Sequence, residues 1–192
     1  EVQHLPSKSW SDLKMTLAPA VHIGLSATPI RSDGRGLDQH FTKLIPGPSV
    51  SQLIHEGFLS RYKLFVPSTV DVSNVHTIAG DYNPHELDTV LRRATVVGDA
   101  ISEYKKRCEG KRALMFLWSI SSSQEMASAL NAAGIAAAHV DGNTPSDLRR
   151  SAIERFRSGE LKVICSVSIF CEGVDIPACE AGFFMRPTQS LS

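Results

Sequence analysis

The chain has 192 residues, 42% of them hydrophobic, which is enough to bury the core of one large domain or two small ones. Its 20 basic and 20 acidic residues cancel, so any nucleic-acid binding must come from local patches rather than from an overall positive field. No apolar run approaches the roughly 20 residues of a membrane span, and no charged-then-apolar leader opens the chain. We therefore expect a cytoplasmic protein with no membrane partner. Glu1 stands in place of an initiator Met, and Ser192 closely follows an apolar run, so we expect a piece of a longer protein.

The N-terminal part of the chain alternates short apolar runs with polar loops. Residues 20–25 (AVHIGL) are bounded by proline and small polar residues, which predicts a buried parallel strand. Residues 31–38 are rich in glycine and charge and predict an exposed loop. A short helix over residues 50–60 and a strand over residues 61–67 are expected next. We place a domain boundary between residues 60 and 61 and interpret residues 68–84, which show little periodicity, as a linker.

The rest of the chain alternates helices and strands more regularly. Apolar residues recur at helical spacing from Leu87 to Tyr104, with Gly98 as the expected break between two helices. Strands are then predicted over residues 113–118, 136–141, 161–167 and 180–186, all buried, and helices over residues 122–134 and 145–160. This alternation predicts an α/β fold, a parallel sheet sandwiched by helices, in which ligands bind at the carboxyl ends of the strands.

The helix over residues 145–160 has the clearest boundary signals. Thr144 is a plausible cap, with Pro145 at the first helical position. We expect its apolar face to consist of Leu148, Ala152, Ile153 and Phe156.

No metal site is predicted. The seven histidines show no paired i, i+4 spacing, and the four cysteines lack the short paired spacing of a zinc site. We interpret the cysteines as reduced core thiols: Cys108, Cys165, Cys171 and Cys179.

The first chemical motif is GLSATPIRSDGRGL, which contains Ser26 and Thr28. It resembles the Ser-Ala-Thr motif of superfamily 2 helicases, in the form found in the restriction-type and excision-repair branch. That family has an Asp-Glu motif at this distance upstream, so the resemblance implies that Glu1 polarises the attacking water and that Gln3, His4, Ser26 and Thr28 couple hydrolysis to movement. Alternatively, Glu1 is a solvated terminal charge, and the hydroxyls only satisfy backbone groups at a strand end.

The second chemical motif is SIFCEGVDIPACEAGFFMRPTQSL, which resembles motif V of the same family and the strand after it. The resemblance implies that Gly173 and Asp175 bind nucleotide. Ser166 and Ser168 are candidates for holding a nucleic-acid phosphate, since hydroxyls and backbone amides at strand ends do this well. A strand ending in a Gly-Asp turn is the structural alternative.

Two further stretches complete the resemblance. FLWSISSSQ looks like motif IV, with Ser119 in the place that contacts the nucleic-acid backbone. HVDGNTPSDLRRSAIERFRSGE resembles the adjoining pattern, in which Gly142 and Arg149 touch that backbone. The arginines of this stretch could instead form the wet face of an amphipathic helix, and we prefer that interpretation for Arg155 and Arg157.

Together these motifs imply a RecA-like helicase domain 2 over residues 61–192, preceded over residues 1–60 by the end of a RecA-like domain 1. The implied parent is an ATP-dependent DNA helicase or translocase that uses ATP and Mg²⁺. The sequence contains no G-x-x-x-x-G-K-[ST] loop and no arginine motif, so we expect these residues alone to be inactive. The alternatives are a non-catalytic nucleic-acid-binding module and a protein-interaction scaffold.

Overall fold

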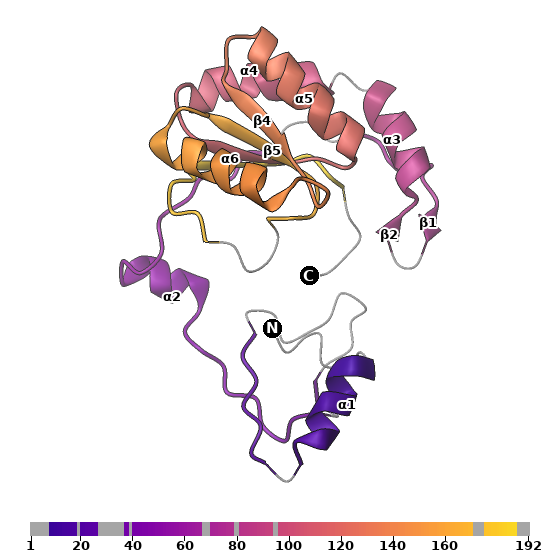
Figure 1. Ribbon diagram of the computed structural model, residues 1–192, viewed down its shortest axis with the longest axis vertical. Coiled ribbons are helices and arrows are strands. Elements are labelled where there is room, and N and C mark those ends of the chain that lie inside the picture. The colour runs from indigo at the N-terminus through magenta and orange to yellow at the C-terminus, as the bar shows by residue number, and fades with distance from the viewer. Residues whose placement is uncertain are drawn as a thin grey trace. The chain divides into compact units, whose positions relative to one another are not determined.

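The computed structural model describes residues 8–18, 20–26, 37–38, 40–66, 70–78, 81–93, 96–170 and 175–187 (Figure 1). The chain divides into two units. One comprises Glu1–Thr69 with Ser190–Ser192, and the other comprises Val70–Gln189. In the described part of the chain, no helix is long and apolar enough to cross a membrane.

The first unit contains two helices, α1 (Lys8–Thr16) and α2 (Val50–His55). The Ser49 side chain caps α2 by accepting a hydrogen bond from the backbone N–H of Gln52 at 3.1 Å. Gly57 follows the helix with a φ of 81°, in the left-handed region that favours glycine. The predicted short helix is therefore confirmed.

The two strands predicted in the first unit are wrong over their described residues. Residues 20–26 and 61–66 form no strand, and the apolar side chains of the first run are 77–91% exposed, at Val21, Ile23 and Leu25. A strand exists only where a neighbour pairs with its N–H and C=O groups. The described residues of this unit contain no other strand that could supply that pairing.

The second unit is built on a four-stranded parallel sheet, so the predicted fold class is confirmed. Its strands are β3 (Ala113–Phe116), β4 (Ala137–Val140), β5 (Val163–Ser166) and β6 (Ala181–Phe184), in the order β4-β5-β3-β6. The strands β3 and β5 are buried as expected, but β6 alternates between exposed and partly buried residues. Phe184 is 79% exposed and stacks on Phe116, with 5.2 Å between ring centroids. The reason is that β6 is an edge strand, whereas α6 (Ser146–Ser158) packs on β4 and β5.

Helices cover both faces of this sheet (Figure 1). The crossovers β3 to β4 and β4 to β5 run in opposite directions across the sheet, so right-handed connections put α5 (Ile120–Ala132) and α6 on opposite faces. Side chains of β3 alternate accordingly. Met115 belongs to the core beneath α5 and α4 (Val96–Cys108), and Leu114 belongs to the core beneath α6 with Phe156.

The two predicted helices between Leu87 and Tyr104 are present, but their break is not at Gly98. Helix α3 (Pro84–Arg93) ends before it, and Gly98 lies inside α4. A glycine inside a helix costs only about 1 kcal/mol relative to alanine. Burial of Ala100 and Tyr104 on α4 outweighs that cost.

Residues 70–93 are more than a connecting linker. They include a small antiparallel hairpin, β1 (Thr77–Ile78) and β2 (Asp81–Tyr82), followed by α3. Val75, Leu87 and Leu91 are at most 7% exposed and belong to the core that also contains Met115. This segment therefore belongs structurally to the second unit.

Helix α6 differs from the prediction at its start and along its apolar face. Pro145 is the cap residue, and Thr144 makes no cap hydrogen bond because its hydroxyl is engaged with Asp141. Ala152 and Phe156 are buried, but Leu148 is 58% exposed. Leu148 lies in the first turn of α6 and is more than half exposed, so it is not part of the buried face.

The cysteine prediction holds fully only for Cys165. It is buried in β5, and burial raises the pKa of its thiol to about 12. Cys108 and Cys179 are free but only partly buried, and Cys171 lies outside the described residues.

Candidate nucleic-acid interface

The loops that leave β3, β4 and β5 meet at one edge of the sheet, because parallel neighbouring strands all end on the same side. Of the predicted site residues, those near this edge in the described part of the chain are Ser119, Gly142, Arg149, Ser166 and Ser168. The structure therefore brings the predicted backbone-contacting residues to the carboxyl ends of three adjacent strands, on loops, at the end of β5 and at the start of α6.

The loop after β4 is held in a tight turn by Asp141. The carboxylate oxygen Oδ1 accepts hydrogen bonds from the backbone N–H of Asn143 at 3.0 Å and from the hydroxyl of Thr144 at 2.8 Å. The same hydroxyl accepts from the backbone N–H of Asp141 at 2.9 Å. The Thr144 hydrogen bond is the main reason why the pKa of Asp141 lies below its ordinary value. The turn is thus built around an ionised carboxylate.

Arg149 reaches back from α6 to the same loop. Its Nη2 donates to the carbonyl oxygen of Thr144 at 3.1 Å and, at 3.4 Å each, to those of Asp141 and Gly142. Its Nε is buried and has no hydrogen-bond partner within the described structure. Arg149 and Gly142, predicted as a pair, do lie together. In this conformation, however, the guanidinium binds the carbonyl oxygens of the loop after β4 and so stabilises that loop.

The β4 and β5 loops come close to one another at Gly142. A Cβ added to this glycine would lie 4.0 Å from Cγ2 of Ile169, which is ordinary van der Waals contact. Next to Ile169, Ser168 is exposed and has a φ of 57°, a left-handed conformation that is uncommon for a residue other than glycine. The Ser168 side chain therefore lies at the surface, one residue before Ile169.

Ser166 is placed differently from its neighbour Ser168. It is fully buried at the end of β5, and its hydroxyl has no hydrogen-bond partner among the described residues. Its carbonyl oxygen accepts from the backbone N–H of Leu117 at 2.9 Å. A phosphate could reach the hydroxyl only if this strand end opened, so the predicted contact through Ser166 stays a prediction.

Ser119 begins α5 and is fixed from two sides. Its hydroxyl accepts from the backbone N–H of Ser122 at 3.2 Å, while the Ser122 hydroxyl accepts from the N–H of Ser119 at 3.1 Å, which forms a capping box. On the other side, the Ser119 hydroxyl donates to Oδ1 of Asp88 on α3 at 3.2 Å. Sequence reasoning missed Asp88 because no local pattern relates it to Ser119.

His139 was also missed. Its Nδ1 lies 2.7 Å from the hydroxyl of Ser123 on α5, and its Nε2 lies 3.5 Å from Oδ2 of Asp141. A serine, a histidine and an aspartate in this order could suggest a nucleophilic relay. Ser123 is fully buried, so no substrate can reach it, and the chain of contacts instead connects α5 to the β4 loop.

The predicted catalytic, coupling and nucleotide-binding residues are mostly outside the described structure. These are Glu1, Gln3, His4, Thr28 and Gly173. Ser26 is partly exposed in the first unit, and Asp175 is exposed in the second. The carbonyl oxygen of Asp175 accepts from Nη2 of Arg157 at 3.4 Å. Arg155 and Arg157 are both exposed, in agreement with the preferred interpretation of them as a wet helix face.

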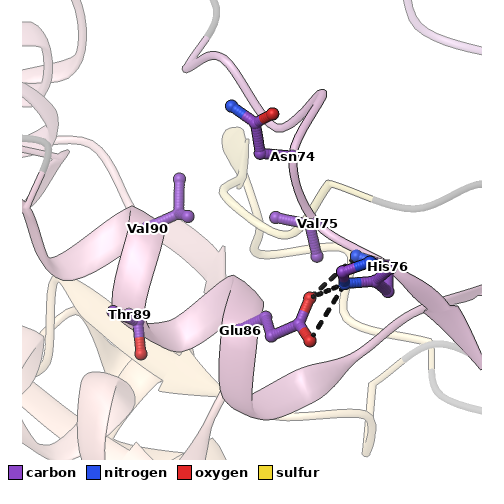
Figure 2. Close-up of a pocket in the computed structure, with 6 residues that line it drawn as sticks. All are labelled: Asn74, Val75, His76, Glu86, Thr89 and Val90. Atoms are coloured by element: carbon purple, nitrogen blue, oxygen red, sulfur yellow. Dashed lines mark hydrogen bonds and ion pairs between the residues drawn. The ribbon is translucent and has the colours of Figure 1, made fainter.

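A shallow, open pocket lies between α3 and the chain that enters the β1–β2 hairpin. Figure 2 shows Glu86 reaching from α3 toward His76, whose backbone N–H donates to Oε2 of Glu86 at 2.8 Å and lowers the pKa of that carboxyl. The lining residues are Asn74, Val75, His76, Glu86, Thr89 and Val90. The contact anchors the hairpin to α3. In the described part of the chain, this pocket included, no cluster of His, Cys, Asp or Glu could hold a metal ion.

Comparisons with known proteins place these features in a wider context. Residues 93–192 match the helicase conserved C-terminal domain. A 51.5 kDa protein of a Lactococcus phage is 33% identical over 191 residues, which is all of this chain and 42% of the phage protein. The DNA 3'-5' translocase XPB2 of Sulfurisphaera tokodaii is 23% identical over 220 residues, covering 92% of this chain and 48% of the translocase.

Two other proteins show the range of similarity. IRC3 of Saccharomyces cerevisiae, named as a candidate ATP-dependent helicase, is 27% identical over 174 residues, covering 88% of this chain and 25% of IRC3. The solved structure of the E. coli DEAD-box protein SrmB superposes with a TM-score of 0.42 and 25% identity, covering 46% of this chain and 52% of that one. The chain spans less than half the length of the curated relatives it matches.

Proposed function

Because the chain belongs to the superfamily 2 helicases, through its conserved C-terminal helicase domain, we propose that it provides the strand-contacting surface of an ATP-driven DNA motor. One observation carries the proposal. The loops leaving β3, β4 and β5 meet at the carboxyl edge of the sheet and place Ser119, Gly142 and Ser168 there. Hydroxyls and backbone amides at such an edge suit the phosphates of a nucleic-acid strand.

The finer parts of the proposal rest on the relatives and on the motifs. DNA is proposed as the nucleic acid along which the motor moves, because relatives from Halobacterium salinarum and Sulfurisphaera tokodaii are named for DNA. ATP, bound with Mg²⁺, is proposed as the nucleotide that is hydrolysed, because a yeast relative is named for ATP dependence. We assign residues 1–60 to the end of the first motor domain, with Glu1, Gln3, His4, Ser26 and Thr28 in the acidic and coupling motifs.

Binding of a fluorescent single-stranded DNA to the 192-residue chain tests the proposed surface. We expect affinity to fall as salt rises, with a log–log slope of roughly −0.7 for each phosphate contacted. Ser168→Glu puts a carboxylate at the carboxyl edge and should weaken binding several-fold. Ser102→Glu adds the same charge at an exposed position of α4 and should weaken it less.

Three outcomes would contradict parts of the proposal. An absence of binding to DNA or RNA at low salt would favour an interaction scaffold. Tighter binding of RNA than of DNA of the same length would overturn the proposal that DNA is the nucleic acid bound. DNA-stimulated ATP hydrolysis by the 192 residues alone would contradict the expectation that they lack a complete site, since they contain no phosphate-binding loop motif.

A further inference from the structure

Helix α3 is tied to the loop after β3 by a polar network centred on Asp88. Oδ1 of Asp88 accepts from the indole Nε1 of Trp118 at 2.8 Å and from the hydroxyl of Ser119 at 3.2 Å. Oδ2 accepts from Nε of Arg92, one helical turn further along α3, at 2.7 Å. A single carboxylate therefore holds two consecutive residues of the loop and is itself held by a guanidinium.

Arg92 extends the network to helix α5. Its Nη1 lies 2.7 Å from both carboxylate oxygens of Glu125, and its Nη2 donates to the hydroxyl of Ser121 at 2.7 Å. Two of the guanidinium nitrogens thus bridge α3 to the first turns of α5, while the third, Nε, is bound to Asp88 within α3. This planar, multidentate arrangement fixes relative position more firmly than a single surface ion pair does.

We propose that Asp88 is a positioning residue for strand binding, holding Ser119 and its loop in the conformation that a nucleic-acid backbone meets. The inference rests on the proposed function. Ser119 is held by Ser122 within α5 and by Asp88 from α3, and its hydroxyl also lies 3.2 Å from that of Ser121, so the position of the side chain is fixed from several sides. A loop that is already ordered loses less conformational entropy when it binds, which raises affinity.

The negative charge of Asp88 lets an experiment distinguish a positioning role from a simple charge effect, because the two predict opposite changes in affinity. Burial alone would raise the pKa of Asp88, but hydrogen bonds from Arg92, Trp118 and Ser119 outweigh burial and hold that pKa below its ordinary value. Asp88 is therefore a carboxylate beside a surface proposed to bind a polyanion. Removing its charge should by itself strengthen binding. Removing a positioning residue should weaken it.

The chain provides a matched control at Glu103. Glu103 on α4 pairs with Arg107 at i, i+4, as Asp88 pairs with Arg92, but it contacts no residue of the β3 loop in the described structure. Asp88→Ala and Glu103→Ala remove the same charge from equivalent helical ion pairs. Only the first also releases Trp118 and Ser119.

The experiment measures binding of a fluorescein-labelled oligothymidine to the 192-residue chain and to both variants at several salt concentrations. We expect Asp88→Ala to weaken binding roughly three- to tenfold, the size of one net hydrogen bond. Glu103→Ala should leave affinity unchanged or slightly raise it. In a Trp10→Phe background, where Trp118 is the remaining tryptophan, Asp88→Ala should also shift the fluorescence emission, whereas Glu103→Ala should not.

A folded Asp88→Ala chain that binds as tightly as the parent, or more tightly, would overturn the inference. If that variant does not fold, Glu125→Gln decides, because it loosens Arg92 from an exposed position. It should then weaken binding by a smaller factor, and unchanged affinity would again overturn the inference. Failure of the parent chain to bind at all would instead refute the proposed function.

Discussion

Replacing Arg149 by alanine tests whether this side chain supports the β4 loop or only attracts the strand. The variant loses one hydrogen bond of normal length, to Thr144 at 3.1 Å, and two long ones at 3.4 Å. A hydrogen bond from a charged donor contributes about 1.5–3 kcal/mol. Arg149 is partly exposed, so in the variant water can hydrogen-bond to some of the carbonyl oxygens that the guanidinium leaves. We therefore expect a loss of about 1–2 kcal/mol in the free energy of unfolding.

The control for this variant is Arg150→Ala. Arg150 is adjacent on α6, carries the same charge and is exposed, so its removal should change the free energy of unfolding by less than about 0.5 kcal/mol. Urea unfolding followed by tryptophan fluorescence gives the two values, and thermal unfolding should show Arg149→Ala melting about 5 °C lower. In the DNA-binding assay both variants lose one charge. Arg149→Ala should lose more affinity because the loop carrying Gly142 relaxes.

One result would refute this reasoning. If Arg149→Ala is as stable as Arg150→Ala but binds DNA much more weakly, the guanidinium acts on the strand directly. The three carbonyl contacts would then contribute nothing to the fold.

Three further predictions concern the core and the turn. Phe156→Ala, on a fully buried side chain, should cost about 3–5 kcal/mol in urea unfolding, whereas Leu148→Ala should cost less than about 0.5 kcal/mol; equal losses would contradict the burial difference. Cys165 should resist alkylation at pH 8 until the chain unfolds, as followed by mass spectrometry, because burial raises its pKa to about 12. The pKa of Asp141 is lowered, so its stabilising contribution is present at neutral pH and lost as the pH falls through the folded pKa. Thr144→Val removes the main cause and should reduce that acid-dependent loss in unfolding curves measured from about pH 6 down to pH 2.

The fold of the second unit was predictable because its elements are defined by local patterns. The apolar runs that became β3, β4 and β5 are short, buried or partly buried, and separated by helices, so their alternation alone indicates a parallel sheet. Residues 20–25 have the same pattern but form no strand, since pairing depends on a neighbour that local sequence does not specify. The exposure of Phe184 could not be predicted for a related reason, because the place of β6 at the edge of the sheet depends on the whole topology.

The candidate site was predictable in part for a similar reason. Gly142 and Arg149 are seven residues apart in one motif, and the structure confirms that they lie together, although Arg149 faces the loop carbonyls. Asp88 and Ser119 are 31 positions apart in different elements, and only the packing of α3 against the β3 loop brings them into contact. A motif can identify which residues approach a ligand. The side chains that hold those residues are chosen by the fold.

The packing of α3 also bears on where this domain should be cut for expression or exchanged between relatives. The matched family region begins at residue 93, the last residue of α3, whereas Leu87 and Leu91 on that helix are at most 4% exposed in the core. A polypeptide starting at residue 93 would leave the side chains beneath both leucines open to water and would lose the carboxylate that holds Trp118. One starting near Val70 keeps this cover. The compact unit therefore begins before the region that the family model matches, and chimaeras joined at residue 93 would combine a core from one protein with an α3 helix from another.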